Sequence, residues 1–347
     1  MLFRSDVALA AVRALRRERP DLKLVVMSAT LDGATVARWL GCPLVEAQAV
    51  TFPVTITHVE RRDERPIDVR VSAAVRAMLQ EEPGDLLVFL PGRGEIERCA
   101  EVLRDLPVDV LPLHGEIPGP EQDRALRSGP RRRVVLATNV AETSVTVEGV
   151  RVVIDTGVAR IAGHDPWSGL PTLSLEPISR ASAAQRAGRA GRTAPGRCLR
   201  LYTRAEHDLR PAESVPELRR VDLTGVVLEL VGRPLEWLDP PPPAAWKAAT
   251  DLLIRLHALT PDGARTPIGD GMARLPTTPR LARLLLDAAA RGVASEGAAL
   301  AAILEERRAG GVEDPVTRAL DARRSEEHTS ELQSHSDLVC RLLLEKK

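Results

Sequence analysis

The chain has 347 residues, enough for roughly two or three ordinary domains, and its 44% of hydrophobic residues excludes a disordered protein. Aromatic residues make up only 2%, so the cores must be aliphatic. Lys+Arg and Asp+Glu balance at 48 each, which excludes a basic field over the whole protein, so contacts with nucleic acid have to be local.

The cysteines are scattered and form no CxxC pair, which argues against a zinc site and against a disulfide framework (Cys42, Cys99, Cys198 and Cys340). We therefore expect no metal held by the chain itself. No apolar run reaches the roughly 18 residues of a membrane helix. The start of the sequence lacks the order of a signal peptide, so we expect a cytoplasmic protein without a membrane contact.

The first predicted strand is the aliphatic run 22–30, which ends in Ser28 and Thr30 and is typical of a buried parallel strand. Further apolar runs predict strands at 85–92, 108–115, 133–139, 150–157 and 197–203, and helical spacing predicts a helix at 94–106. Alternating helices and continuous Val/Leu strands predict an α/β fold with a parallel sheet.

A Pro/Gly turn divides residues 158–177 into two strand-like halves, which predicts a β-hairpin projecting from that sheet. After Pro211 the pattern becomes helical. Helices are predicted at 216–230, 244–259, 278–292 and 294–310, with a short wing or turn region at 260–275.

Small polar residues follow several of the predicted strands. Gly115, Thr138 and Asn139, the only asparagine of the chain, lie at the carboxyl ends of two of them. Ligands of parallel α/β sheets bind at the carboxyl ends of the strands. Residues 138–149, which include Thr143, also offer hydroxyl and backbone N–H groups that can hold phosphate oxygens without reading bases.

The segment "QRAGRAGR", residues 185–192, concentrates fixed positive charge between glycines. Ser179 is a predicted N-cap for the helix that leads into it. Glycine is a poor choice for a solvated helix face but lets the backbone approach a partner closely. Two arginines directed at a γ-phosphate can stabilise the charge that develops during phosphoryl transfer.

Four segments together resemble motifs III, IV, V and VI of the DEAH-box helicases of superfamily 2. They are "MSATLD", "LLVFLPGRGEIE", "VVLATNVAETSVTVEGVRVVIDTG" and "QRAGRAGRTAPGRCLRLYT". The "FPV" after the first segment and the "FLPGRGEI" form resemble the bacterial HrpB branch. The resemblance runs from Arg4 to about Leu320. It implies two RecA-like domains with ATP and Mg²⁺ between them and RNA across the top, followed by winged-helix and helical-bundle, ratchet-like domains.

The resemblance also assigns roles to single residues. Arg189 and Arg192 match arginines that contact the γ-phosphate, and Gln185 matches the residue that positions the attacking water or phosphate. Ser28, Thr30 and Glu148 match residues that couple nucleotide state to movement. The expected contacts with the nucleic-acid strand are Gly115, Thr138, Asn139 and Thr143.

The expected domains are a remnant of the first RecA-like domain at 1–50, the second RecA-like domain at 51–212, a winged-helix-like domain at 213–275 and the start of a ratchet-like domain at 276–323. Residues 324–347 change composition abruptly and begin like a translated sequencing-library adaptor, so we expect an artefact there.

No lysine follows a glycine in the chain, so the phosphate-cradling loop GxxxxGK[ST] is missing from this sequence, and no Asp-Glu-x-His occurs. The predicted function is therefore a catalytically incomplete fragment of an ATP-dependent RNA helicase, a monomer acting on single-stranded or duplex RNA, with DNA left open. The alternatives are a non-catalytic module that binds single-stranded nucleic acid and a folded protein without activity.

Overall fold

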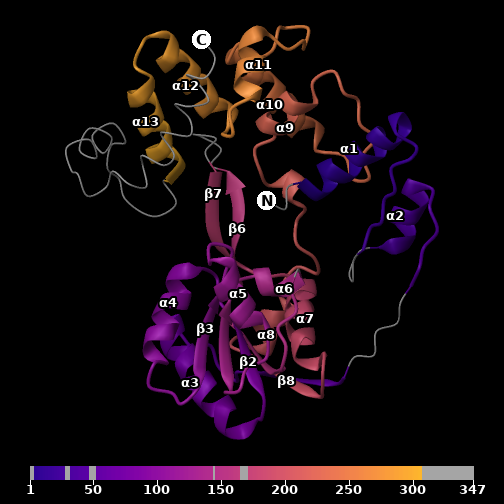
Figure 1. The fold of residues 1–347 in the computed structure, drawn as a ribbon. Coiled ribbons are helices and arrows are strands. Elements are labelled where there is room, and N and C mark those ends of the chain that lie inside the picture. Colours follow the sequence, from indigo (N-terminus) through magenta and orange to yellow (C-terminus); the bar gives the residue numbers. More distant parts are fainter. Residues whose placement is uncertain (1–3, 28–31, 47–51, 144, 165–170, 307–347) are drawn as a thin grey trace. The chain divides into compact units, whose positions relative to one another are not determined.

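The computed structural model describes residues 4–27, 32–46, 52–143, 145–164 and 171–306 (Figure 1). The chain divides into two compact units, which are treated separately. The sheet unit comprises Glu46–Ile161 and Leu173–Val215. The helical unit comprises Met1–Val45, Ala162–Thr172 and Pro216–Lys347. Each of the two hairpin strands therefore has some residues in one unit and some in the other.

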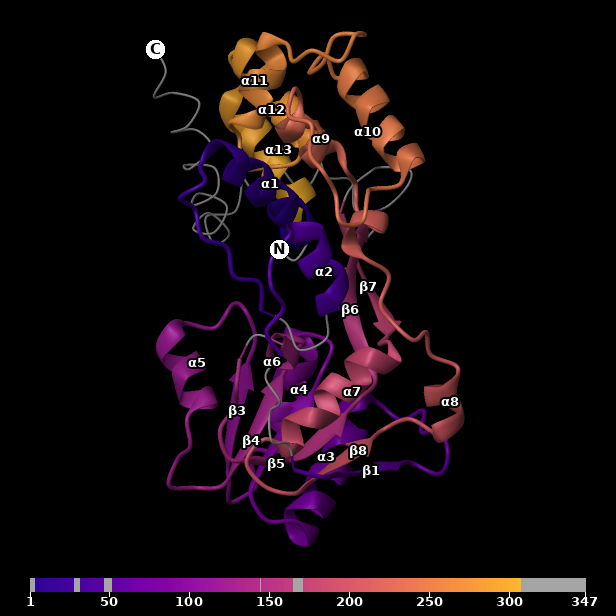
Figure 2. The ribbon, with the colours of Figure 1, turned by 90° about the vertical axis from the view of Figure 1, so that its right-hand side faces the viewer.

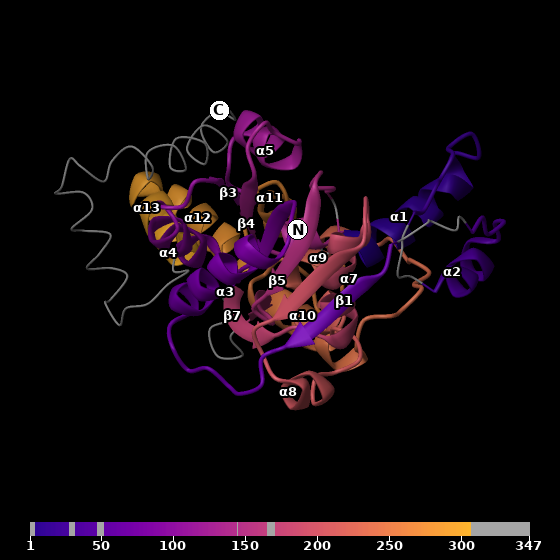
Figure 3. The same cartoon turned by 90° about the horizontal axis from the view of Figure 1, so that it is seen from below.

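The sheet unit is built on a six-stranded sheet with the order β1-β8-β5-β2-β4-β3, in which every pair is parallel. Figure 3 shows this sheet from below, with β1 at one edge. Its strands are β1 (Val54–His58), β2 (Asp85–Phe89), β3 (Asp109–Leu113), β4 (Arg133–Ala137), β5 (Val150–Asp155) and β8 (Gly196–Arg200). Its helices are α3 (Ile67–Glu81), α4 (Arg93–Val102), α5 (Gly119–Leu126), α6 (Val140–Thr143), α7 (Arg180–Gly188), the 3₁₀ turn η1 (Arg189–Gly191) and α8 (Arg204–Asp208). The predicted parallel α/β fold is confirmed.

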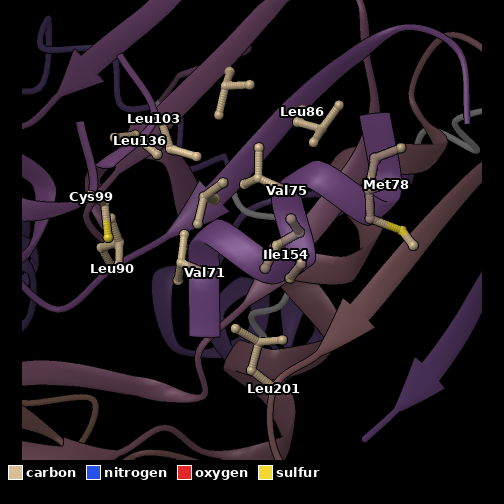
Figure 4. Packing of buried hydrophobic residues seen from close by; sticks show 14 of the residues in the cluster. Val71, Val75, Met78, Leu86, Leu90, Cys99, Leu103, Leu136, Ile154 and Leu201 are labelled. Atoms are coloured by element: carbon tan, nitrogen blue, oxygen red, sulfur yellow. The ribbon is translucent and has the colours of Figure 1, made fainter. Parts of the chain in front are cut away.

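Successive side chains of the central strands enter two different cores, because neighbouring residues of a strand point to opposite faces. Leu86 and Val88 of β2 pack with Val71 and Val75 of α3 on one face of the sheet. Figure 4 shows this aliphatic cluster around α3. Phe89 and its partners on the other face pack against α5, α6 and α7. Helices on both faces leave the carboxyl ends of the strands as the place for a site.

The hairpin strands β6 (Val158–His164) and β7 (Pro171–Pro177) pair in a separate two-stranded sheet, as the sequence predicts. The helical unit contains α1 (Arg4–Glu18), α2 (Gly33–Leu40), η2 (Glu217–Arg219), α9 (Thr224–Leu230), α10 (Pro243–Arg255), α11 (Pro267–Ala273), α12 (Pro279–Ala290) and α13 (Ala294–Glu306). Val7 of α1 packs on the core that α9 to α13 form. None of the helices in the described part of the chain has the length and apolar character that a membrane crossing requires.

The predicted strand at 22–30 is wrong over its described part. Residues 22–27 form no strand, and the side chains of Val25 and Met27 are 77% and 88% exposed. A strand needs a neighbouring strand to satisfy its backbone N–H and C=O groups. The strands of the described residues all come from Val54 onwards, and those of the sheet unit pair with one another, so an aliphatic composition alone cannot make this run a strand.

Three further elements differ from the prediction. β1 was not predicted, because it is short and none of its five residues is fully buried, so it gives no continuous apolar run. The predicted helix at 216–230 is divided into η2 and α9, and the Asp222 side chain accepts the backbone N–H of Thr224 at 2.9 Å where α9 begins. The predicted turn region at 260–275 has a single bridge between Leu259 and Arg265 and then forms α11. Residues 324–347 lie outside the described residues.

Candidate functional site

Polar residues gather where β3 and β4 end. Leu113 of β3 pairs with Ala137 of β4, so Gly115 and Thr138 follow neighbouring strands at the same edge of the sheet. The backbone N–H of Thr138 donates to Leu113 O at 3.2 Å, and Asn139 O accepts the N–H of Glu142 at 2.9 Å as α6 begins. Gly115 and Asn139 are exposed. Three of the four residues predicted to contact the nucleic-acid strand therefore lie at one edge of the sheet. The fourth, Thr143, is the last residue of α6.

Helix α7 carries the arginine segment across the same sheet, beside β5 (Figure 2). It begins as the sequence predicts, because Ser179 is its N-cap and accepts the backbone N–H of Ser182 at 3.1 Å. Its last turn continues into η1. Arg186, Arg189 and Arg192 thereby lie within hydrogen-bond distance of Glu142, Val145 and Thr146, respectively.

Arg186 is fully buried and is held by two carboxylates. Its Nη1 donates to Asp155 Oδ1 at 2.9 Å, its Nε donates to Glu142 Oε2 at 3.0 Å, and its guanidinium lies 4.8 Å from the centre of the Phe89 ring. Burial alone would lower the pKa of Arg186, but the two carboxylates more than offset this and raise it. Arg186 is therefore a fixed cation inside the unit.

Arg189 and Arg192 have different surroundings. Arg189 is only 8% exposed, and it donates to two main-chain carbonyls, Val145 O at 2.7 Å and Glu142 O. Burial, and then repulsion from Arg192, lower the pKa of Arg189 to about 10, against the attraction of Glu142. Arg192 is exposed and donates from Nη1 to the Thr146 hydroxyl. Of the two arginines expected to face a nucleotide, only Arg192 is open to solvent.

The glycines in and just after the arginine segment differ in whether the unit has room for a side chain at their positions. A Cβ atom on Gly191 would lie 2.5 Å from Phe52 O, and one on Gly196 would lie 2.3 Å from Ala190 O, so the chain approaches itself closely at both positions. A Cβ on Gly188 would meet no atom within 4 Å. Gly188 is thus the position whose small size the unit itself does not require.

The remaining predicted residues are less closely connected to these arginines. Glu148 Oε2 accepts the backbone N–H of Ser128 at 3.0 Å, and that bond lowers the pKa of Glu148, with Arg127 and Arg133 as the nearby cations. Gln185 is half-buried on α7. Ser28 and Thr30 lie outside the described residues.

Sequence reasoning assigned no role to three residues that hold the arginines in place: Glu142, Asp155 and Thr146. Glu142 and Thr146 lie within a segment noted for its hydroxyl and backbone groups, and Asp155 is the last residue of β5, where the sequence predicts a cluster of small polar residues. A carboxylate at the end of a buried strand is a signal that could have pointed to a buried cation, because unpaired buried charges are costly.

The comparisons with known proteins agree with this geometry. Residues 70–194 match the family model described as the helicase conserved C-terminal domain. The chain is 41% identical to the ATP-dependent RNA helicase HrpB of Escherichia coli over 318 residues, which cover 88% of this chain and 39% of that protein. It is 35% identical to the pre-mRNA-splicing factor ATP-dependent RNA helicase prp22 of Schizosaccharomyces pombe, covering 86% of this chain and 27% of that protein.

Solved structures give the same result. The structure is similar to the crystal structure of the Escherichia coli DEAH/RHA helicase HrpB, with a TM-score of 0.85 and 37% identity over 99% of this chain and 44% of that chain. A second crystal structure, of the E. coli DExH-box NTPase HrpB, gives a TM-score of 0.78 and 38% identity. The chain thus spans less than half the length of these relatives. Over nearly its whole length the chain is similar to part of the DEAH-box RNA helicases of the HrpB type, and it carries their helicase conserved C-terminal domain at residues 70–194.

Proposed function

We propose that the chain is part of an ATP-dependent RNA helicase. Its sheet unit supplies Gln185, Arg189 and Arg192 to a nucleotide held by another lobe, and Gly115, Thr138, Asn139 and Thr143 to the backbone of an RNA strand. The observation that carries this proposal is that one segment, α6 with the residues beside it, includes proposed RNA contacts and also accepts hydrogen bonds from an arginine proposed to face the nucleotide. Thr138 and Asn139 open this segment, and Arg189 donates to carbonyls in its second half.

The proposal extends to the other parts of the chain. Ser28, Thr30 and Glu148 couple nucleotide state to movement, and Mg²⁺ accompanies the ATP. Residues 1–50 belong to a first RecA-like domain, 51–212 form the second, 213–275 are winged-helix-like, and 276–323 begin a ratchet-like domain. The protein works in the cytoplasm as a monomer. The names of the relatives, which are ATP-dependent RNA helicases, support the reaction and the substrate.

We expect the purified chain not to hydrolyse ATP, because the lysine of a phosphate-cradling loop is missing from its sequence and arginines alone do not hold a triphosphate for attack. The measurement is steady-state phosphate release with Mg²⁺-ATP, with and without RNA, for the chain and its Arg192→Ala variant. Both proteins should give the same background rate. Turnover by the chain that Arg192→Ala abolishes would show that it carries a complete active site.

The second candidate is a module that binds single-stranded nucleic acid without turnover. The exposure of Gly115 and Asn139 at one edge of the sheet favours it for the isolated chain. Binding of a labelled RNA with and without ATP tests this module. RNA binding that ATP does not change agrees with it, whereas an effect of ATP requires a nucleotide site in the chain and contradicts it.

A further inference from the structure

Glu142 contacts two arginines of the segment at once, through different atoms. Its carboxylate accepts Arg186 Nε at 3.0 Å, and its main-chain carbonyl accepts Arg189 Nη2. These arginines lie three positions apart, where helical geometry places side chains on the same face. Glu142 therefore connects Arg186, which is fixed in place, to Arg189, whose direction matters for the proposed function.

The fixed end of this link is Arg186. It is completely buried and pairs with Asp155, itself fully buried at the end of β5. Asp155 also accepts the Tyr202 hydroxyl at 3.0 Å and the backbone N–H of Gly157 at 2.9 Å, so its own position is determined by several bonds. The Glu142 carboxylate, whose side chain is 14% exposed, is thus attached to an immobile cation.

The other end of the link is Arg189, which is held in a different way. The bonds of its guanidinium go to the main-chain carbonyls of Glu142 and Val145. The direction of the guanidinium therefore depends on where the carbonyl groups of Glu142 and Val145 lie. Glu142 lies in α6, a helix of only four residues, which has little stability of its own.

We propose that Glu142 is a positioning residue for Arg189. Its ion pair with Arg186 fixes the main chain at Glu142, and the carbonyls of Glu142 and Val145 fix the direction of the Arg189 guanidinium. The purpose of this device rests on the proposed function, in which Arg189 meets a nucleotide. The device itself is a property of the sheet unit alone, and it needs neither ATP nor RNA to be tested.

The test is modification of the chain with phenylglyoxal, followed by mapping of each arginine by mass spectrometry. The reagent adds to neutral, accessible guanidine groups. In the wild-type chain we expect rapid modification of Arg192, slow modification of Arg189 and none of Arg133, which is 1% exposed on β4. In Glu142→Gln, the rate at Arg189 should rise by about fivefold or more, and hydrogen exchange of the Val145 amide should rise with it as the segment opens locally, while Arg133 stays protected. Loss of the Glu142 charge by itself also lowers the pKa of Arg189 and speeds its modification, but it leaves the exchange of the Val145 amide unchanged.

The matched control is Glu95→Gln, which removes a carboxylate of the same unit that pairs with Arg160 at 3.1 Å. It should raise the modification of Arg160 and leave Arg189 unchanged. An unchanged rate at Arg189 in folded Glu142→Gln would overturn the proposal. An equal rise at Arg133 would overturn it too, because Glu142 would then support the whole unit rather than Arg189.

Discussion

Asp155→Asn is expected to lower the free energy of unfolding of the sheet unit by about 3 kcal/mol, because it removes one partner of a fully buried ion pair and leaves the Arg186 charge under-compensated. Glu142 still pairs with Arg186, which keeps the loss at the low end for such changes. The Tyr202 hydroxyl also loses a charged acceptor.

Urea unfolding followed by circular dichroism measures this loss, and hydrogen exchange of the β2 and β5 amides assigns it to the sheet unit. The matched control is Asp208→Asn. It breaks an ion pair with Arg204 whose side chains are 71% and 54% exposed, and such pairs contribute little. A loss below about 1 kcal/mol for Asp155→Asn would mean that Arg186 does not depend on Asp155.

Gly196→Ala is expected to cost about 3 kcal/mol or more and to displace the arginine segment. The new Cβ would lie 2.3 Å from Ala190 O and 2.7 Å from Arg151 O, and both are main-chain atoms that cannot rotate away. Ala190 lies in η1 between Arg189 and Gly191, so the clash pushes η1 off the start of β8. Unfolding midpoints and phenylglyoxal modification of Arg189 measure the two effects.

Gly188→Ala is the control for this substitution. Its Cβ would enter open space at the end of α7, where alanine favours the helix, so stability should be unchanged or rise by about 0.5–1 kcal/mol. Equal stability of the two variants would show that η1 does not pack against β8 as described.

The fold was predictable wherever burial alone determined the strand. β2 and β4 are buried at every residue, and such runs are recognisable from their continuous Val and Leu residues. The run 22–27 has the same composition, but composition does not say whether a neighbouring strand is present. β1 shows the reverse, since its half-exposed residues give no continuous apolar signal.

The candidate site was predictable as a set of segments but not as a set of contacts. Sequence reasoning identified the arginines but could not tell which one is buried. That depends on Asp155 and Glu142, which lie 31 and 44 residues before Arg186 and meet it only in the folded unit. The spacing of the arginines is the same at each step, whereas their exposure ranges from fully buried Arg186 to exposed Arg192.

The most direct test of the account is whether the strand-end surface binds RNA. Fluorescence anisotropy of a labelled oligouridylate should show binding by the chain that weakens as salt is raised. Asn139→Ala should reduce the affinity by about tenfold, or about 1.4 kcal/mol, without changing stability, because Asn139 is exposed. Absence of binding, or equal affinity of the Asn139→Ala variant, would contradict the account.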